Sequence, residues 1–171
     1  MKKEKNRDTL EPYNWIDVLI RFAQISGTFA GFCITFIVLT IGGKVADVQI
    51  WSIGVTYGQI SVFLFGTSAA LFIFASQRFL RAQEHNLWRL PVEYKEAIMK
   101  DGSFTDSQWE ELLLSSDKKC REYEKEGRWT YDGASLVMIL GLFFAIASYN
   151  SGVALFVLII GVVLEALQIF K

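Results

Sequence analysis

The chain has 171 residues, of which 52% are hydrophobic and 20% are charged, and its formal net charge is -1. The charges are sorted along the chain, because no Asp, Glu, Lys or Arg occurs in the windows 22–43, 48–77 and 133–164. A helix needs about 20 apolar residues to cross about 30 Å of hydrocarbon. The composition therefore excludes an ordinary soluble globular domain, a disordered chain and a disulfide scaffold, and it favours a small polytopic membrane protein.

The first two windows each predict one membrane-spanning helix. With their flanks they give a first span at 15–42 and a second at 51–77, after an N-terminal tail at 1–14. A short extracytoplasmic loop at 43–50 joins the two spans. The second span is long enough to tilt in the bilayer.

The third window is too long for one span, because as a single helix it would measure about 48 Å at 1.5 Å per residue. The turn-forming run Tyr-Asn-Ser-Gly at 149–152 divides it. We predict a third span at 131–149 and a fourth at 153–171, joined by an extracytoplasmic turn at 150–152. The expected fold is all-α, with four transmembrane helices and a short cytoplasmic helical segment at 78–130 between the second and the third.

The placement of lysine and arginine predicts the orientation, because cytoplasmic loops carry an excess of these residues. The tail carries four of them and the segment 78–130 carries ten, whereas the loop at 43–50 carries only Lys44. We therefore expect both termini and 78–130 in the cytoplasm, and the protein in the plasma (inner) membrane. Three tryptophans fall at predicted span ends, where aromatic residues anchor the interface: Trp15, Trp51 and Trp129.

The segment 78–130 contains its own helix pattern. Thr105 or Asp106 is suited to cap a helix that runs from Ser107 to about Glu126. The segment has two interpretations: a short helical hairpin packed under the membrane, or a docking surface for a cytoplasmic protein partner. Its mixed charges argue against nucleic acid as a partner. Anionic lipids are a further expected partner, beside a row of three arginines: Arg78, Arg81 and Arg89.

The first span carries most of its polar side chains on one helical face. We call this face the polar stripe, and it consists of Asp17, Arg21, Gln24, Thr28, Gly31, Thr35 and Val38. Polar groups in hydrocarbon are costly unless they face another helix or water, so the polar stripe is not expected to face lipid. The opposite side carries bulky residues suited to lipid or to bulky packing: Phe22, Ile25, Phe29, Phe32 and Phe36.

Two explanations of the polar stripe remain open. In the first, it is a seam between the first span and its neighbours, with threonine hydroxyls bonded back to their own helix. In the second, it lines a pore in a homo-oligomer, where symmetry turns each residue into a ring. Arg21 would then form a basic ring near the cytoplasmic mouth, Thr28 and Thr35 would form hydroxyl rings, and Val38 would form an apolar constriction.

Small residues and two acids complete the candidate contacts. Gly27 in the first span and a row in the second permit close helix approach, the row being Gly54, Gly58 and Gly66. Asp17 and Arg21 are placed for a local salt bridge. Glu165 lies near the cytoplasmic end of the last span, where it pairs with Arg21 or extends toward the headgroups.

A catalytic site is not predicted. His85 is the only histidine, and no carboxylate pair or Cys/His arrangement surrounds it at a readable spacing. Cys33 and Cys120 match no metal motif, so we expect neither an enzyme nor a bound cofactor or metal. The leading hypothesis is a homo-oligomeric ion channel lined by the first span. The alternative is a non-conducting membrane adaptor that oligomerises through its helices and binds a cytoplasmic partner through 78–130.

The layout resembles that of Orai-type channels in one respect. It combines four spans and cytoplasmic termini with a Gly-Phe pair, Gly31-Phe32, in the first span. Those channels place an acidic ring toward the outer end of the first helix, whereas residues 37–39 of this chain are Ile-Val-Leu. The resemblance therefore implies that such a layout can build a pore, and it does not imply calcium selectivity.

Overall fold

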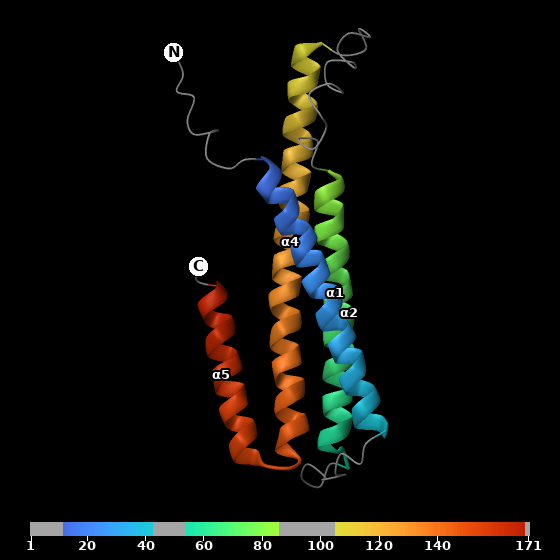
Figure 1. The fold of residues 1–171 in the computed structure, drawn as a ribbon, viewed down its shortest axis with the longest axis vertical. Helices are drawn as coiled ribbons and strands as arrows, with labels where there is room; N and C mark the ends of the chain where they lie inside the picture. The colour runs from blue at the N-terminus through green and yellow to red at the C-terminus, as the bar shows by residue number, and fades with distance from the viewer. Residues whose placement is uncertain (1–11, 43–53, 86–104, 170–171) are drawn as a thin grey trace.

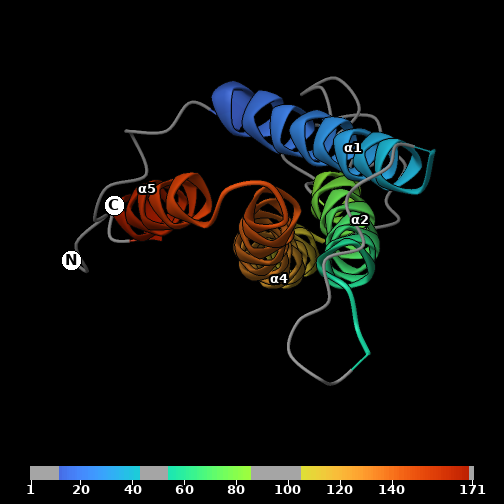
Figure 2. The ribbon, with the colours of Figure 1, turned by 90° about the horizontal axis from the view of Figure 1, so that it is seen from below.

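The computed structural model describes residues 12–42, 54–85 and 105–169, which form an all-α arrangement (Figure 1). The helices are α1 (Pro12–Gly42), α2 (Tyr57–Glu84), α4 (Asp106–Ala147) and α5 (Ser151–Ile169). Seen end-on, α1 lies across one side of the pair formed by α2 and α4, and α5 flanks α4 (Figure 2). The chain thus builds a core of three helices with a fourth at its side.

Three of these helices are long and apolar enough to cross a membrane. They cover Asp17–Ile41, Tyr57–Glu84 and Ser107–Ala147. The apolar stretch of α5 whose side chains are described, Ser151–Val163, is shorter. Lengths above about 20 residues match the hydrocarbon thickness. The three helices therefore suggest an integral membrane protein, as the charge-free windows predicted.

The beginning of α2 differs from the predicted start of the second span at residue 51. Thr56 caps the helix, because its hydroxyl accepts a hydrogen bond from Gln59 N at 3.2 Å while the Gln59 side chain accepts one from Thr56 N at 3.1 Å. Gly54 precedes this cap with a left-handed φ of 73° and therefore lies outside the helix. It does not belong to the packing row predicted for it.

The cytoplasmic helix and the third span predicted separately are one continuous helix, α4, of 42 residues. At 1.5 Å per residue it is about 63 Å long, and it extends well past the end of α2 (Figure 1). Thr105 rather than Asp106 is its N-cap, in a capping box with Gln108. No proline interrupts the residues between the two predicted elements, so nothing ends the helix there.

The turn between α4 and α5 lies at 148–150, close to the predicted turn at 150–152, and Ser151 and Gly152 already belong to α5. After α4 ends, the Asn150 side-chain oxygen accepts hydrogen bonds from Gly152 N at 3.0 Å and Val153 N at 3.1 Å. These bonds satisfy two of the free amides at the start of α5. The chain therefore reverses within a few residues.

A ladder of stacked phenylalanines joins α1 to α2. The ring centroids of Phe22 and Phe79 are 5.3 Å apart, and those of Phe29 and Phe72 are 5.4 Å apart. A third pair lies 5.0 Å apart: Phe36 and Phe65. The paired phenylalanines are seven residues apart on each helix, and their numbers rise along α1 while they fall along α2. Two antiparallel helices therefore keep the rings in register. We call these pairs the phenylalanine ladder.

Of the two environments predicted for these α1 phenylalanines, lipid or bulky packing, the ladder shows packing. Their partners on α2 are fully buried, with exposed fractions of 0%. Ile25 and Phe32, which the same pattern grouped with them, are 44% and 56% exposed. The bulky face predicted from the sequence is therefore split between packing and exposure.

Small residues of α4 receive the other side of the ladder. A Cβ on Gly127 would lie 2.9 Å from the Phe79 ring, and one on Gly141 would lie 3.3 Å from the Phe65 ring. Ala134, midway between these glycines, is fully buried in the cluster that contains Phe72. The three small residues are again seven apart, so each rung of the ladder meets a place where the α4 backbone can approach closely.

Serine hydroxyls of α2 bond across the helix seams. Ser68 Oγ donates to Ala134 O at 2.8 Å, and Ser61 Oγ donates to Gly141 O at 3.0 Å. Ser76 Oγ donates to Ala23 O of α1 at 3.1 Å. In an apolar environment such bonds between helices add to the packing, because no water competes for the donors.

The fit of Gly127 against Phe79 makes a testable prediction. We expect Gly127→Ala to destabilise the fold by about 1–3 kcal/mol, because the added methyl group would overlap a fully buried ring. Thermal unfolding of the detergent-purified chain measures this change.

Gly133→Ala is the matched control in the same helix, because nothing lies within 4 Å of a Cβ there. Its higher helix propensity should leave stability unchanged or raise it by about 0.5–1 kcal/mol. Equal melting temperatures for the two variants would contradict the close packing of α4 on the ladder.

Candidate functional site

The face of α1 that packs inside the subunit is made of small and apolar residues. It consists of Leu19, Ala23, Ser26, Ala30 and Cys33, all 6% exposed or less. Their alternating spacing of four and three residues is that of a helix seam. Cys33 adds a polar contact, since its thiol donates to Ser68 Oγ at 3.6 Å.

The polar stripe lies on the opposite side of the helix. Five of its members stand two positions before a residue of the buried face, which is a rotation of about 200° at 3.6 residues per turn. These five are Asp17, Arg21, Gln24, Thr28 and Gly31. All seven stripe residues are exposed, and in the end-on view the outer side of α1 meets no other described helix (Figure 2). The polar stripe is therefore not a seam between helices of the described part of one subunit.

The threonine hydroxyls of the stripe bond back to their own helix, as the seam interpretation expected. Thr28 Oγ1 donates to Gln24 O, and Thr35 Oγ1 donates to Gly31 O, both at 2.9 Å. The hydroxyl hydrogens are thereby used, and the oxygens present lone pairs outward. The two threonines thus present hydrogen-bond acceptors on the outer face of α1.

The glycines predicted for packing divide between two roles. Gly66 of α2 faces α1, because a Cβ there would lie 4.0 Å from Ile37 Cδ1. Gly58 is half-buried. Gly27 and Gly31 have nothing within 4 Å of a Cβ position. They leave a narrow, open strip of α1 that includes Gly31 of the polar stripe. A second helix could approach closely there.

The predicted pair of Asp17 with Arg21 is not among the ion pairs of the described residues, whereas the predicted pair of Arg21 with Glu165 stays a prediction. Asp17 and Arg21 are both exposed, and the ion pairs described among residues 17–163 join other residues: Arg78 with Glu126, Arg121 with Asp117, and Arg128 with Glu124. The side chain of Glu165 lies outside the described residues. Arg21 therefore lies on the outward face of α1.

Sequence reasoning missed a buried acid beside the N-terminal half of α1. Glu124 of α4 is 8% exposed, and its carboxylate lies 2.8 Å from Arg128 Nε. Burial raises the pKa of the Glu124 carboxyl above its ordinary value, while the Arg128 cation opposes part of the rise. The Arg128 guanidinium lies 5.7 Å from the centre of the Phe22 ring. This pair ties α4 to α1 near Arg21.

Three arginines mark one level across the three long helices. Arg21 and Arg78 are sequence neighbours of Phe22 and Phe79, which stack on each other, and Arg128 follows Gly127, which contacts Phe79. On each helix the charge-free window lies to the same side of this level. The apolar parts of α1, α2 and α4 are therefore aligned, as one membrane slab requires.

Metal-binding residue types do not cluster in the described part of the chain, and His85 has a packing contact. No group of three or more His, Cys, Asp or Glu that could hold a metal occurs among the described residues. His85 stacks on Tyr123 at 5.3 Å, and its backbone oxygen accepts a hydrogen bond from Ser116. In the described structure, then, His85 closes the end of α2 against α4.

Comparison with protein-family models, with curated proteins and with solved structures finds no match to this chain.

Substitution by leucine on the two faces of α1 should affect stability differently. Ser26 is 0% exposed, so Ser26→Leu should destabilise the subunit by about 1–3 kcal/mol through overpacking. Thr28→Leu changes an exposed position and should stay within about 0.5 kcal/mol of the unchanged protein. Thermal unfolding in a detergent that keeps the chain monomeric compares the two. A larger loss of stability for Thr28→Leu than for Ser26→Leu would contradict the assignment of the Ser26 face to the core.

Proposed function

We propose that the protein is a homo-oligomeric integral membrane protein whose α1 helices surround an ion-conducting pore. One observation carries this proposal: the polar stripe lies opposite the buried face of α1 and is exposed along its whole length. Side chains such as Arg21 and Gln24 are costly in hydrocarbon. A ring of subunits would turn them toward water instead.

The pore belongs between subunits rather than within one. The phenylalanine ladder and the small residues of α4 fill the space between α1, α2 and α4, and Phe65, Phe72 and Phe79 are 0% exposed. No water path runs through such a packed centre. The open strip at Gly27 and Gly31 supports close contact with a neighbouring copy of α1.

The stripe residues then take distinct roles in the proposed pore. Arg21 forms a basic ring at the cytoplasmic mouth, which favours anions or tunes the exit of cations. The back-bonded oxygens of Thr28 and Thr35 supply acceptors for water and passing ions deeper in. Val38, which is 62% exposed, forms an apolar constriction near the outer end.

The proposed topology has four spans with both termini in the cytoplasm. The fourth span is α5, whose 19 residues make about 28 Å of helix. It packs on α4 closely, since a Cβ on Gly161 would lie 2.8 Å from Ile139 Cγ2. The excess of lysine and arginine in 1–14 and 78–130 orients the chain in a plasma (inner) membrane.

Ion flux through liposomes tests the conducting function. The purified protein should pass ions, Thr28→Leu should sharply reduce the rate, and Arg21→Ala should shift the preference from anions toward cations. Ile34→Ala is the matched control, because Ile34 is exposed on the same helix but lies off the polar stripe. No flux in any salt, with an intact oligomer, would overturn the proposal.

Cross-linking tests the oligomer separately from conduction. In a Cys33→Ala, Cys120→Ala background, Val38→Cys should give linked dimers with a short bifunctional thiol reagent, because symmetry brings the α1 stripes around one axis. Phe63→Cys is the control: it is 72% exposed on α2 at about the depth of Val38, since Phe36 stacks on Phe65. Cross-linked dimers from Phe63→Cys but not from Val38→Cys would contradict the placement of α1 around the axis.

A non-conducting membrane adaptor is the second candidate, and one observation favours it. The cytoplasmic part of α4 exposes two leucines, Leu112 at 37% and Leu114 at 65%, and this part extends past α2 (Figure 1). Exposed apolar side chains on a projecting helix are suited to bind a partner protein. An oligomer that conducts no ions but retains a cytoplasmic protein through Leu114 would favour this function.

A further inference from the structure

An open groove lies between α2 and α4 at the cytoplasmic end of the apolar region. Its volume is about 570 Å³, within the range of small-molecule sites. The lining residues are Phe74, Arg78, Glu122, Lys125, Glu126, Trp129 and Thr130. Glu126 and Arg128 are two positions apart, which is about 200° around the helix. The groove therefore lies on the other side of α4 from the Arg128 contact with α1, outside the proposed pore.

The groove opens at the depth of lipid headgroups. On α2 it lies where the charge-free window 48–77 gives way to Arg78, and on α4 it lies just before the window 133–164 begins. Trp129, at the rim, is 70% exposed, which is typical of the aromatic belt at a membrane interface. A ligand of this groove therefore meets apolar chains on one side and water on the other.

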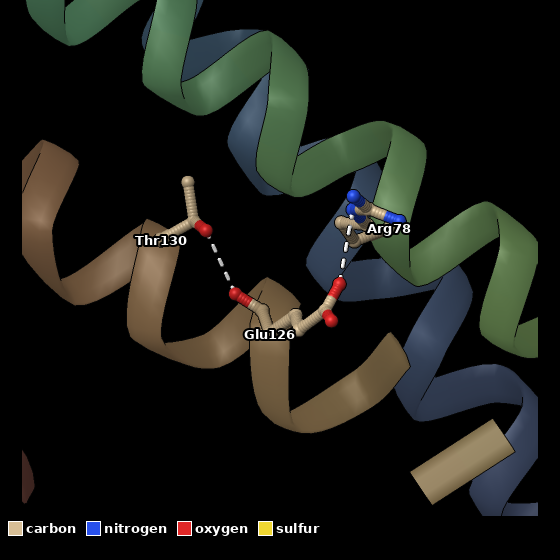
Figure 3. A network of polar contacts seen from close by, with 3 residues as sticks. All are labelled: Arg78, Glu126 and Thr130. Carbon is tan, nitrogen blue, oxygen red and sulfur yellow. Dashed lines mark hydrogen bonds and ion pairs between the residues drawn. The ribbon is translucent and has the colours of Figure 1, made fainter. Parts of the chain in front are cut away.

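Arg78 is held in place with donors to spare. Its guanidinium lies 4.5 Å from the centre of the Phe74 ring and 5.4 Å from that of Tyr123. Its Nε is 3.2 Å from Glu126 Oε2, yet this buried nitrogen has no hydrogen-bond partner, because the carboxylate is not aligned with it. Figure 3 shows Arg78 of α2 and Glu126 of α4 facing each other, with Thr130 bonded to the Glu126 backbone oxygen. A guanidinium fixed in this way is suited to a phosphate.

The charges of the groove balance. Arg78 and Lys125 are cationic, while Glu122 and Glu126 are anionic. A purely anionic headgroup would leave both carboxylates facing like charge. A zwitterionic headgroup meets a partner for each of its charges, and a primary ammonium also donates hydrogen bonds to carboxylates.

We propose that this groove binds a phospholipid with a phosphoethanolamine headgroup, its phosphodiester on Arg78 and its ammonium on Glu126. Lys125 and Glu122 extend the same two contacts on the α4 side. Phe74 and Trp129 border the upper acyl chains. The site does not depend on ion conduction, because it lies on the outer perimeter of the subunit.

Native mass spectrometry of the detergent-purified full chain tests the proposal. It is carried out with phosphatidylethanolamine, phosphatidylglycerol and phosphatidylcholine of the same acyl chains. We expect preferential retention of phosphatidylethanolamine, reduced about tenfold or more by Arg78→Gln, because a charge-assisted contact is lost. Glu126→Gln should remove the preference over phosphatidylglycerol. Arg121→Gln is the control, because Arg121 is 74% exposed on α4 and does not line the groove, and it should retain the lipid.

Trp129→Ala provides a variant that keeps the fold, because this side chain is largely exposed, and it should also weaken retention. Equal retention of all three lipids, or stronger retention of phosphatidylglycerol, would overturn the proposal. So would unchanged retention by both Arg78→Gln and Trp129→Ala. Displacement of the lipid by glycerophosphoethanolamine or by inorganic phosphate at equimolar concentration would identify a site for a soluble phosphate compound and would also overturn it.

Discussion

The phenylalanine ladder between α1 and α2 is the contact on which the rest of the subunit depends. Helices in hydrocarbon gain little from the hydrophobic effect, because lipid tails are as apolar as their side chains. Association then relies on dispersion contacts and on hydrogen bonds between helices. The ladder supplies the contacts on one side of α2, with the small residues of α4 on the other. Ser61 and Ser68 supply the hydrogen bonds.

The ladder also decides which way α1 faces. Once Phe22, Phe29 and Phe36 stack on α2, the rotation of the helix is fixed, and the face carrying Gln24 and Thr28 points away from the subunit. A rotation of α1 about its axis would separate the rings. The packing inside one subunit and the chemistry on its outer surface are thus set by the same register.

Much of the architecture was predictable from where charges are absent. The windows 22–43 and 48–77 locate α1 and α2, and the window 133–164 locates the end of α4 together with α5. The periodicity of α1 collects the stripe on one face. The sequence of one helix cannot tell whether phenylalanine faces lipid or another helix, because both environments are apolar. The matching seven-residue repeats of α1 and α2 were the signal that could have resolved it.

The remaining differences come from contacts that no local pattern contains. Gly127 looks like a point where a helix could end, yet its missing side chain is what lets α4 pass Phe79 without interruption. The groove at Arg78 and the buried Glu124 each need two helices to be placed first. Side chains of such sites are scattered in the sequence, so their proximity follows only from the packing.

The continuity of α4 has a mechanical consequence. A helix of 42 residues without a proline has no hinge, so its projecting and apolar halves move as one rod. A displacement of the projecting end is therefore carried along the helix to its far end, past the contacts of Gly127, Ala134 and Gly141 with α2. Because α5 is attached to the far end by a turn of a few residues, it must follow. The projecting end of α4 and the turn into α5 are therefore mechanically connected across the apolar region.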